Sequence, residues 1–508
     1  MSRPPLRTRN LPAFHVTAEP VRPEVPASVA AAEHAVEPRG PASGPRIGFV
    51  TLGCDKNTVD SERMMAALAG QGARVSGEVQ DAEVVVVNTC GFIEAAKEES
   101  IETILEACAL KEEGNASAVV AVGCLVQRYK EELARELPEV DLFMGLTEMQ
   151  GLVPELRRRG LLVEEGRAVP NMERPLRVLS TDTPHTSFLK ISEGCDHACA
   201  FCAIPHMRGL HRSHPVEELV REAQELERAG VVELNVISQD TTWYGRDLRR
   251  RNGRGAAGEG GPAPLLPGLL RALLDGTEIP WYRLFYMYPS GITRELVELL
   301  GSSDRILPYL DMPIQHGSDR MLELMRRPER RATIRERVRW LRDAVPDLTL
   351  RTTVIVGFPG ETEEDFREMQ ELLEEIRFER VGAFPYSLEE DTRAAEMEGH
   401  LPEEVKQERL TEVMDLQREI AFEENEAQVG RVMEALVDRR VEDDPEFVAQ
   451  GRTASQAAEV DGVTQILPRA EGDPGPEPGR RIQVEVVGSL DHDLVARVVE
   501  SESRGGTP

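Results

Sequence analysis

The sequence predicts an α/β protein with two parallel-sheet regions followed by a small β-barrel. In two separate stretches, apolar strand-like runs alternate with helical stretches, and the last stretch holds short strands with turn signals. The 508 residues suffice for two to four domains, and a hydrophobic fraction of 40% is ordinary for a soluble globular protein. We expect an extension followed by three domains, over residues 1–45, 46–165, 181–420 and 424–500.

The first 45 residues are rich in Pro and Ala, as in RPPLRTRNLP, and offer little to bury. We therefore predict that they are disordered. No apolar run approaches the ~20 residues that a membrane helix needs, and the N-terminus lacks the apolar core of a secretory signal. An odd number of cysteines, seven, indicates reduced thiols. We expect a cytoplasmic monomer without membrane contact.

Three strand-like runs in the first region each end in a cysteine: RIGFVTLGC, AEVVVVNTC and ASAVVAVGC. Helical stretches separate them, which predicts a parallel sheet. Functional groups of such sheets collect at the carboxyl ends of the strands. Cys54, Cys90 and Cys124 are therefore expected to converge, although three core cysteines at strand ends would show the same spacing. Cys108 lies within a helical stretch and is interpreted as core packing.

The second region predicts a partial (β/α)6 barrel, whose active site would lie at the carboxyl-terminal mouth. A Gly-rich surface loop, 249–264, interrupts it. The six candidate strands are HTSFLKIS, VVELNVIS, WYRLFYMYP, PYLDMP, LTLRTTVIVGFP and RVGAFPYS.

Directly after the first of these strands, three cysteines follow the spacing C-x3-C-x2-C: Cys195, Cys199 and Cys202. Three thiolates are one short of a four-cysteine zinc site. They suit an iron–sulfur cluster in which one iron stays open for a substrate or cofactor. The alternative is a zinc knuckle, with His197 and His206 as the nearest further ligands; we interpret both as loop residues.

The last region, from about residue 425, predicts a small β-barrel. Residues 427–508 hold 9 Lys and Arg against 16 Asp and Glu, a net charge of −7, and the whole chain carries −30. A barrel that docks nucleic acid should be basic, because neutralisation of phosphates drives that binding. The acidic balance favours a basic partner, such as a ribosomal protein, although it is also a common solubility trait.

Several motifs together resemble the radical S-adenosylmethionine methylthiotransferases over about residues 46–500. GCDHACAFCAIPHMRG resembles the radical S-adenosylmethionine signature, with Phe201 before the last cysteine. The final barrel is similar to a TRAM domain. The remaining motifs are VTLGCDKNTVDSERM, VVNTCGFIEAAKEES, AVGCLVQRY, LNVISQDTTWYG, YLDMPIQHGSDRMLELMRR and RTTVIVGFPGETEEDF.

Two branches of this family differ in substrate. TLGCDKNTVDSE, SQDTTWYG and YLDMPIQHGSD resemble the branch that modifies an aspartate of small-subunit ribosomal protein 12. The branch that modifies an adenosine in transfer RNA typically shows Tyr-Gly-Cys-Gln-Met-Asn. The sequence departs from the family at Asp55, where Pro is usual, and in AFPYSLEEDTRAAEM, where Ala-Tyr-Ser-Pro is more usual.

The resemblance implies two 4Fe-4S clusters. The cluster on Cys195, Cys199 and Cys202 would bind S-adenosylmethionine and yield a 5′-deoxyadenosyl radical, which removes a hydrogen from the β-carbon of the aspartate. The cluster on Cys54, Cys90 and Cys124 would carry the sulfur, which a second S-adenosylmethionine methylates. The implied partners are ribosomal protein 12 or the ribosome, an electron donor such as flavodoxin or ferredoxin, and a sulfur source.

Five further residues are candidate cofactor contacts. Gly357 and Gly360 of TVIVGFPGE would let the backbone approach the adenine side of S-adenosylmethionine; the alternative is a plain strand-to-helix turn. Ser238, Gln239 and Asp240 close a strand and should face the barrel mouth, toward cofactor or substrate. The alternative for Asp240 is a helix cap.

Other polar residues near the signature are weaker candidates. Arg208 and Arg212 would pair with a carboxylate of cofactor or substrate, unless they are solvated loop charges. Tyr286 and Tyr288 are expected to pack within the barrel. A non-catalytic zinc or RNA-binding adaptor is the hypothesis of a different class, and metal analysis separates it, since two 4Fe-4S clusters imply about eight irons per chain.

Overall fold

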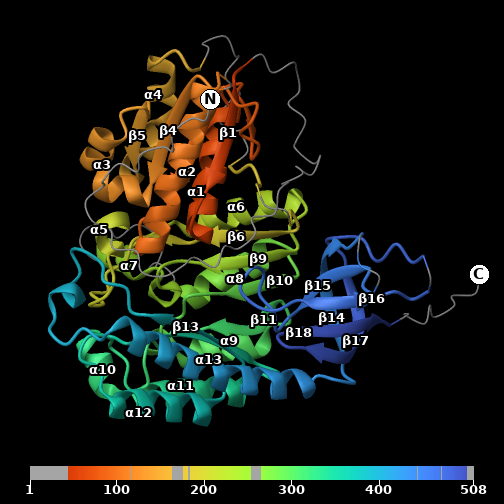
Figure 1. The fold of residues 1–508 in the computed structure, drawn as a ribbon. Helices are drawn as coiled ribbons and strands as arrows, with labels where there is room; N and C mark the ends of the chain where they lie inside the picture. Colours follow the sequence, from red (N-terminus) through yellow and green to blue (C-terminus); the bar gives the residue numbers. More distant parts are fainter. Residues whose placement is uncertain are drawn as a thin grey trace, which may run out of the picture. The chain divides into compact units, whose positions relative to one another are not determined.

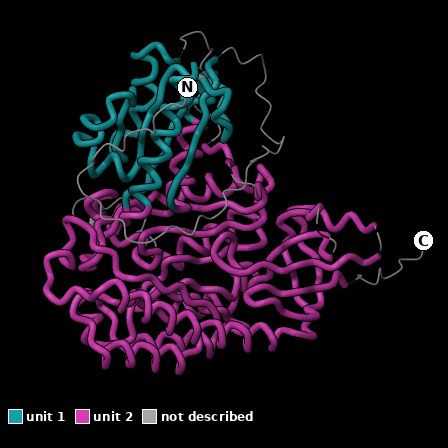
Figure 2. The backbone as a smooth tube through the Cα atoms, viewed as in Figure 1, with its two compact units in different colours: residues 1–53, 67–91, 96–174 teal, residues 54–66, 92–95, 175–508 magenta. Residues whose placement is uncertain are grey.

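A computed structural model describes residues 44–114, 116–162, 176–180, 183–252, 265–442, 444, 446–470 and 472–499. The chain divides into two compact units, each described by itself below (Figure 2). The first comprises residues 1–53, 67–91 and 96–174, and the second 54–66, 92–95 and 175–508. The expected extension over 1–45 lies outside the described residues except for 44 and 45. Of the Gly-rich loop expected over 249–264, residues 249–252 instead end helix α7 (Arg246–Asn252), and the rest lies outside the described residues.

The first unit is built on a five-stranded parallel sheet in the order β2-β1-β3-β4-β5 (Figure 1). The expected parallel sheet is confirmed, and its three predicted strands are β1, β3 and β4. The sequence does not predict the edge strands β2 and β5, because each has only three or four residues. The strands are β1 Arg46–Thr51, β2 Arg74–Ser76, β3 Val84–Thr89, β4 Ala118–Gly123 and β5 Leu142–Gly145.

Strands β3 and β4 are buried at every residue. Their uninterrupted Val and Ala runs are typical of a parallel strand that is covered on both faces. Residues Val85, Val87 and Val119 share a core cluster with Ile104 and Leu133. The helices that belong to this unit wholly or in part are α1 Asp55–Ala69, α2 Glu94–Glu112, α3 Cys124–Glu136 and α4 Leu152–Arg158.

The second unit contains a six-stranded sheet in which every strand pairs in parallel with its neighbour in the chain. Because β6 and β13 are the two edges, the sheet is open, as expected for a partial barrel. All six predicted strands are present: β6 Thr186–Lys190, β9 Glu233–Ile237, β10 Trp281–Leu284, β11 Ile306–Asp311, β12 Thr349–Val356 and β13 Arg380–Pro385.

Helices pack on one face of this sheet in a large core cluster, to which Leu234, Leu284, Leu269 and Phe366 belong. The other face has a smaller cluster with Ile237, joined by side chains of the C-terminal barrel. Among the described residues, no helix is long and apolar enough to span a bilayer. The main helices are α6 Val216–Arg228, α8 Leu266–Gly276, α9 Arg294–Ser302, α11 Arg331–Ala344, α12 Glu363–Ile376 and α13 Glu403–Glu426.

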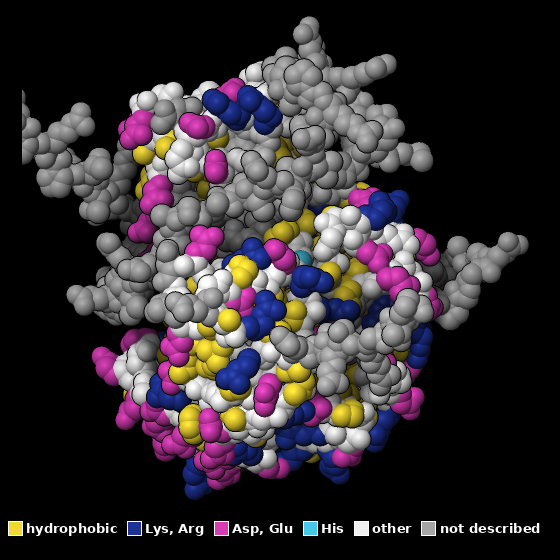
Figure 3. Space-filling model, turned by 90° about the vertical axis from the view of Figure 1, so that its right-hand side faces the viewer, with side chains coloured by type: hydrophobic (Ala, Val, Ile, Leu, Met, Phe, Trp, Pro, Cys, Tyr) yellow, Lys and Arg dark blue, Asp and Glu magenta, His cyan; other side chains and the backbone are white. Residues whose placement is uncertain are grey.

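The C-terminal strands close into a barrel in the order β14-β15-β16-β18-β17, which confirms the expected small β-barrel. On the face shown in Figure 3, Lys and Arg side chains are interspersed with Asp, Glu and apolar ones. The acidic balance of this region therefore does not form one continuous acidic patch on that face. The strands are β14 Val432–Arg440, β15 Ala449–Thr453, β16 Thr464–Leu467, β17 Arg481–Leu490 and β18 Asp493–Val498.

A buried ionic network joins this barrel to the amino-terminal ends of the central strands. Arg452 contacts Glu233, the first residue of β9, at 2.5 Å and Asp438 at 2.8 Å. Glu233 also accepts a 2.8 Å hydrogen bond from Arg283, and neither side chain is exposed. His185 lies 3.1 Å from Asp438. The charges of this network are thus paired with one another within the protein, which suits a structural role.

Candidate active site

The three signature cysteines lie in the loop after the first strand of the central sheet. Strand β6 ends at Lys190, and the loop runs from there to helix α5, Ile204–Arg208. The backbone N–H of Cys195 donates to the Gly209 carbonyl at 3.0 Å, and that of Cys202 donates to the Cys199 carbonyl at 3.2 Å. These bonds fold the loop so that one short segment presents all three thiols at the carboxyl end of β6.

The signature thiols are largely enclosed. Cys195 and Cys199 are buried, and Cys202 is half-buried. Burial raises the pKa of the Cys195 thiol to about 12 and raises that of Cys202 as well. Without a bound group these thiols are therefore protonated at neutral pH, and a cationic centre that binds their thiolates must displace the protons.

Two side chains that the sequence did not single out as functional contact Cys199. The Tyr288 hydroxyl lies 3.5 Å from its Sγ, and Nη1 of Arg327 lies 3.8 Å away. The Arg327 guanidinium also stacks on the Tyr288 ring at 3.7 Å and donates to the Pro313 carbonyl at 2.9 Å. A buried permanent cation thus lies beside this sulfur.

His197, which the sequence suggests is only a loop residue, is held on three sides. Its Nε2 lies 2.7 Å from Oδ2 of Asp240. Its ring stacks on Tyr288 with centroids 4.2 Å apart, and it meets Trp243 edge-on at 4.6 Å. The residues between the first two cysteines are thus fixed against the loops that follow β9 and β10.

The residues after β9 have distinct surroundings. Asp240 caps the short turn Thr241–Trp243, accepting from Thr242 N at 2.9 Å, so it combines the predicted cap with its contact to His197. Ser238 is buried, and its hydroxyl contacts that of Ser192. Gln239 is half-buried. All three follow the carboxyl end of β9, just as the signature loop follows the carboxyl end of the neighbouring strand β6.

The glycines of TVIVGFPGE form a strand-to-helix turn between β12 and α12. Both have left-handed backbone, with φ of 70° at Gly357 and 79° at Gly360, which favours glycine. Phe358, between them, shares an apolar cluster with Ala200 of the signature loop and with Tyr386. The turn therefore packs beside the signature loop.

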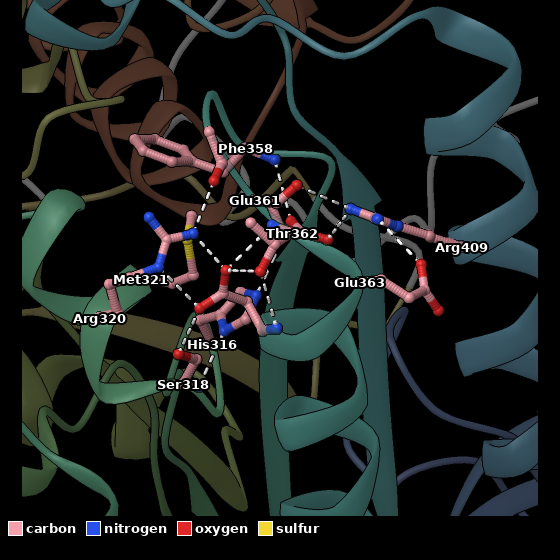
Figure 4. A network of polar contacts seen from close by, with 11 residues as sticks. His316, Ser318, Arg320, Met321, Phe358, Glu361, Thr362, Glu363 and Arg409 are labelled. Carbon is pink, nitrogen blue, oxygen red and sulfur yellow. Dashed lines mark hydrogen bonds and ion pairs between the residues drawn. The ribbon is translucent and has the colours of Figure 1, made fainter.

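Polar contacts fix this turn from both sides (Figure 4). Glu361 receives a 2.7 Å hydrogen bond from Arg409, and Arg320 donates to the Gly360 carbonyl at 2.6 Å. Asp365 and Thr362 form a capping box at the start of α12. Asp365 also accepts from Arg320 at 3.1 Å.

Arg208 has partners within its own unit. It is buried, and it donates to Asn57 at 2.6 Å, to Asp60 at 3.1 Å and to Glu193 at 3.1 Å. These bonds tie the first half of α1 to the signature region. Arg212, in contrast, is exposed.

A cavity of about 530 Å³ adjoins the signature loop. Asp196, His197 and Ala198 form one wall, between the first two cysteines. The other lining residues come from the loops after β9 and β10, from the start of α7 (Arg246–Asn252), and from α10 (Asp319–Leu324) and the segment that follows it. They are Asp240, Thr242, Trp243, Arg246, Ser290, Gly291, Glu323, Arg326, Arg327, Pro328 and Arg330.

In the first unit, Cys90 and Cys124 leave neighbouring strands at the same level, because Thr89 pairs with Gly123 in the β3–β4 register. A Cβ on Gly91 would lie 2.7 Å from the Leu125 backbone, so the chain after Cys90 runs directly against the chain after Cys124. Both cysteines are buried. The structure thus brings these two together.

Cys54 falls in the second unit, where it immediately precedes α1 and is exposed. Its carbonyl accepts from Asn57 N at 2.8 Å in the first turn of that helix. Asp55, the departure from the usual Pro, accepts from the Tyr286 hydroxyl at 3.2 Å. Cys108 is buried within α2, and burial raises its pKa to about 11.

The signature loop fits an iron–sulfur cluster by its chemistry. Among the residues that the structure describes, no three His, Cys, Asp or Glu side chains are gathered to hold a single metal ion. Thiolates that hold a cluster bind separate irons, which lie apart from one another. Three thiols on one loop provide that ligand set. A buried guanidinium lies beside one of them.

Three family models match the chain in turn. Residues 46–145 match the family described as UPF0004, an uncharacterized protein family. Residues 189–373 match the radical SAM superfamily, and residues 429–499 match the TRAM domain.

The curated relatives are similar over nearly the whole chain. The ribosomal protein uS12 methylthiotransferase RimO of Anaeromyxobacter sp. (strain K) is 46% identical, over 91% of this chain and 95% of its own length. That of Symbiobacterium thermophilum is 44% identical, over 90% and 91%. That of Clostridioides difficile is 39% identical, over 89% and 99%. A more distant structural likeness is the radical S-adenosylmethionine methyltransferase TsrM of Kitasatospora setae, with a TM-score of 0.46 and 15% identity over 68% of this chain and 73% of that one. Its similarity to these curated relatives shows that the chain belongs to the RimO family of ribosomal protein uS12 methylthiotransferases.

Proposed function

We propose that the protein is a radical S-adenosylmethionine methylthiotransferase that places a methylthio group on the β-carbon of an aspartate of ribosomal protein uS12. One observation carries this proposal: the C-x3-C-x2-C loop follows the first strand of an open parallel sheet, in a chain 39–46% identical to enzymes of that name. The C–H bond that must break is not acidic enough for a general base, so a radical route suits the substrate.

Cys195, Cys199 and Cys202 would hold a 4Fe-4S cluster with one open iron. When bound, that cluster supplies the electron for reductive cleavage of S-adenosylmethionine. Arg327 and Tyr288 would position Cys199 for the cluster, since both contact its sulfur.

The remaining cofactor contacts are proposed from their position beside the signature loop. Ser238, Gln239 and Asp240 lie at the carboxyl end of β9, and Asp240 orders His197. The Gly357–Gly360 turn packs on the loop through Phe358. These residues would bind and orient S-adenosylmethionine and exclude water from it.

Cys54, Cys90 and Cys124 would hold a second cluster. The support is that Cys90 and Cys124 leave adjacent strands at one level. An open iron of that cluster would keep the sulfur that is to be transferred. The chain would then need about eight irons in all.

The overall change replaces one hydrogen by a methylthio group. One S-adenosylmethionine accepts an electron and is cleaved to methionine and a 5′-deoxyadenosyl radical, which takes a hydrogen atom from the aspartate. A second gives its methyl group to the sulfur, and joining the carbon radical to that methylthiolate would release one electron again. The electron comes from an external donor such as flavodoxin or ferredoxin, and the sulfur from an external source. We propose that the enzyme acts in the cytoplasm as a monomer, on free uS12 or on the ribosome.

The test is an anaerobic reaction with reconstituted protein, S-adenosylmethionine, sulfide and a reductant. Purified uS12 and unmodified transfer RNA are offered separately, and both are analysed by mass spectrometry. We expect a gain of about 46 mass units on the uS12 aspartate, since a methylthio group replaces hydrogen. A uS12 variant with Ala in place of that aspartate should gain nothing.

A gain on transfer RNA with unmodified uS12 would contradict the substrate assignment while leaving the radical chemistry in place. A colourless protein that binds zinc and cleaves no S-adenosylmethionine would contradict the chemistry itself.

A further inference from the structure

Tyr286, the second residue after strand β10, has a backbone conformation that bulky side chains disfavour. Its φ angle is 57°, in the left-handed region, which is an outlier for an aromatic residue. Two neighbouring segments hold it there. Its backbone N–H donates to Asp311, the last residue of β11, at 3.1 Å, and its carbonyl accepts from the backbone N–H of Thr241, after β9, at 3.1 Å. Such conformations persist where the surroundings fix them, and they cluster at functional sites.

The Tyr286 side chain contacts the first turn of helix α1. Its hydroxyl donates to Oδ2 of Asp55 at 3.2 Å, and Nζ of Lys56 lies 3.3 Å from the centre of its ring. Lys56 also pairs with Oδ1 of Asp55 at 3.1 Å, and only 6% and 10% of these two side chains are exposed. Each of the three groups thus contacts the other two. We call Asp55, Lys56 and Tyr286 the α1 clamp.

The α1 clamp lies directly beside Cys54, in the same compact unit. Cys54 precedes Asp55 in the chain, and its carbonyl accepts from the backbone N–H groups of Asn57 at 2.8 Å and Thr58 at 3.2 Å. The backbone of Cys54 is therefore fixed by the turn that Tyr286 contacts. Burial, followed by nearby negative charges that include the Cys54 sulfur, raises the pKa of Tyr286, so the hydroxyl and that sulfur lie within electrostatic range.

A separate contact ties this turn to the signature region. Arg208, at the end of α5, donates to the Asn57 side chain at 2.6 Å. The turn that carries Cys54 is thus bound both to the segment after β10 and to the helix after the signature cysteines. A group held on Cys54 would therefore have a fixed position relative to the mouth of the central sheet.

We propose that Tyr286 is a positioning residue for sulfur transfer: through the α1 clamp it holds Cys54, and with it the sulfur, in place at the mouth of the central sheet. The inference rests on the proposed function, because it needs a second cluster with Cys54 among its ligands. In the step concerned, the substrate carbon radical bonds to the methylthiolate sulfur and one electron is released. Tyr286 gains and loses nothing. Such a step depends on the separation of the reacting atoms, and a misplacement of about 1 Å can slow it about 100-fold.

The first test measures how much S-adenosylmethionine cleavage leads to product. The reconstituted full-length protein reacts anaerobically with uS12, and methylthiolated uS12 and 5′-deoxyadenosine are both quantified. Tyr286→Phe keeps the ring over Lys56 but loses the hydrogen bond to Asp55. We expect its ratio of product to 5′-deoxyadenosine to fall about tenfold, because a displaced sulfur captures fewer carbon radicals.

The matched control is Tyr282→Phe, the same change on strand β10 itself. The Tyr282 hydroxyl bonds to Thr277, and its ring packs in the core cluster on the helix-covered face of the sheet. The control therefore loses a buried hydrogen bond that is remote from Cys54. Its ratio of product to 5′-deoxyadenosine should equal that of the wild type.

The second test examines the clamp in the full-length protein without clusters. Amide hydrogen exchange of Asn57 and Thr58 reports on the turn, because both N–H groups bond to the Cys54 carbonyl. We expect Tyr286→Phe to exchange these amides about fivefold faster, because one hydrogen bond that holds the turn is lost. Tyr282→Phe should exchange them at the wild-type rate.

Variants of Asp55 test whether the clamp acts as a unit. Asp55→Ala removes the acceptor of the Tyr286 hydroxyl, so we expect its product ratio to fall at least as far as that of Tyr286→Phe. The double variant should fall no further than Asp55→Ala, because both changes break the same bond. Asp55→Asn, which keeps an acceptor oxygen, should restore most of the ratio.

A product ratio in Tyr286→Phe equal to that of the wild type would overturn this inference alone, and so would an equal fall in Tyr282→Phe. Wild-type protein that forms no methylthiolated uS12 would overturn the proposed function together with the inference.

Discussion

Each end of the central six-stranded sheet carries a buried arginine, but the groups around that arginine differ between the two ends. At the amino-terminal end, Glu233 has two arginine partners, Arg283 and Arg452, and its side chain is completely buried. At the carboxyl-terminal end, Arg327 is also buried and pairs with Glu329 at 3.2 Å, but it contacts a thiol, Cys199, beside a cavity as well. The first network joins two domains through ion pairs; the second lies beside the signature thiols and a cavity.

This difference separates stability from chemistry within one sheet. Parallel sheets of this class collect functional groups at the carboxyl ends of their strands, whereas the opposite end contributes stability. The predictions below test whether the two ends can be disturbed independently.

The largest effect on stability is expected from Glu233→Ala, which leaves the buried guanidinium of Arg283 without its carboxylate and Arg452 with Asp438 alone. Breaking a buried pair in this way costs about 3–5 kcal/mol. Urea unfolding of the wild type and the variant measures the loss. Arg271→Ala, on the exposed face of α8, is the control and should change stability by less than about 0.5 kcal/mol. A loss below about 1 kcal/mol in Glu233→Ala would contradict a structural role for this end.

The pH dependence of that effect sharpens the comparison. Burial alone would raise the pKa of Glu233, but the Arg452 and Arg283 charges outweigh it and hold the pKa below its ordinary value. A carboxyl group with a lowered folded-state pKa stabilises the protein above its unfolded-state pKa, about 4.3. That stabilisation is lost as pH falls through the folded-state value.

The stability difference between the wild type and Glu233→Gln should therefore be constant between pH 7 and 5 and shrink below about pH 4. Unfolding midpoints across this range measure it. A difference that grows as the solution is acidified would contradict the ion-pair assignment.

At the mouth of the barrel, Asp240→Ala should cost less stability but disturb the signature loop. It removes the cap of a short turn, worth about 1 kcal/mol, and the partner of His197. Since His197 meets the Trp243 ring, we expect the tryptophan fluorescence to change in the folded variant. Asp240→Asn retains the cap, and its fluorescence should lie between that of the wild type and that of Asp240→Ala. Unchanged fluorescence in Asp240→Ala would argue against the His197 geometry.

The smallest effect is expected from Thr362→Ala, in the turn beside the signature loop. The variant loses the capping box with Asp365, worth about 0.5–2 kcal/mol. Thermal unfolding would show a small decrease, with cluster content unchanged. Thr362→Ser, which keeps the capping hydroxyl, is the matched control and should restore most of the loss.

The sequence predicts the central features of the fold because strand runs and helical stretches alternate clearly. All six core strands and three of the five first-unit strands are recognisable, whereas β2 and β5 are too short to show a pattern. The signature cysteines are evident from spacing within a single loop.

The surroundings of those cysteines are not evident from the sequence. Arg327 lies 128 residues from Cys199, and nothing in an isolated arginine marks it as a sulfur neighbour. Arg208 illustrates the reverse case: its position beside the signature suggests a ligand contact, yet Asn57, Asp60 and Glu193 are its partners here. Both depend on tertiary contacts that sequence spacing does not encode.

The most direct test of the central claim compares two triple variants: Cys195, Cys199 and Cys202 to Ala, and Cys54, Cys90 and Cys124 to Ala. Iron content, S-adenosylmethionine cleavage and methylthiolation of uS12 are measured for each. We predict that each variant keeps about four irons. The first should cleave no S-adenosylmethionine. The second should still produce 5′-deoxyadenosine but transfer no methylthio group. Cleavage that survives the first set of substitutions, or iron that is unaffected by the second, would contradict the account.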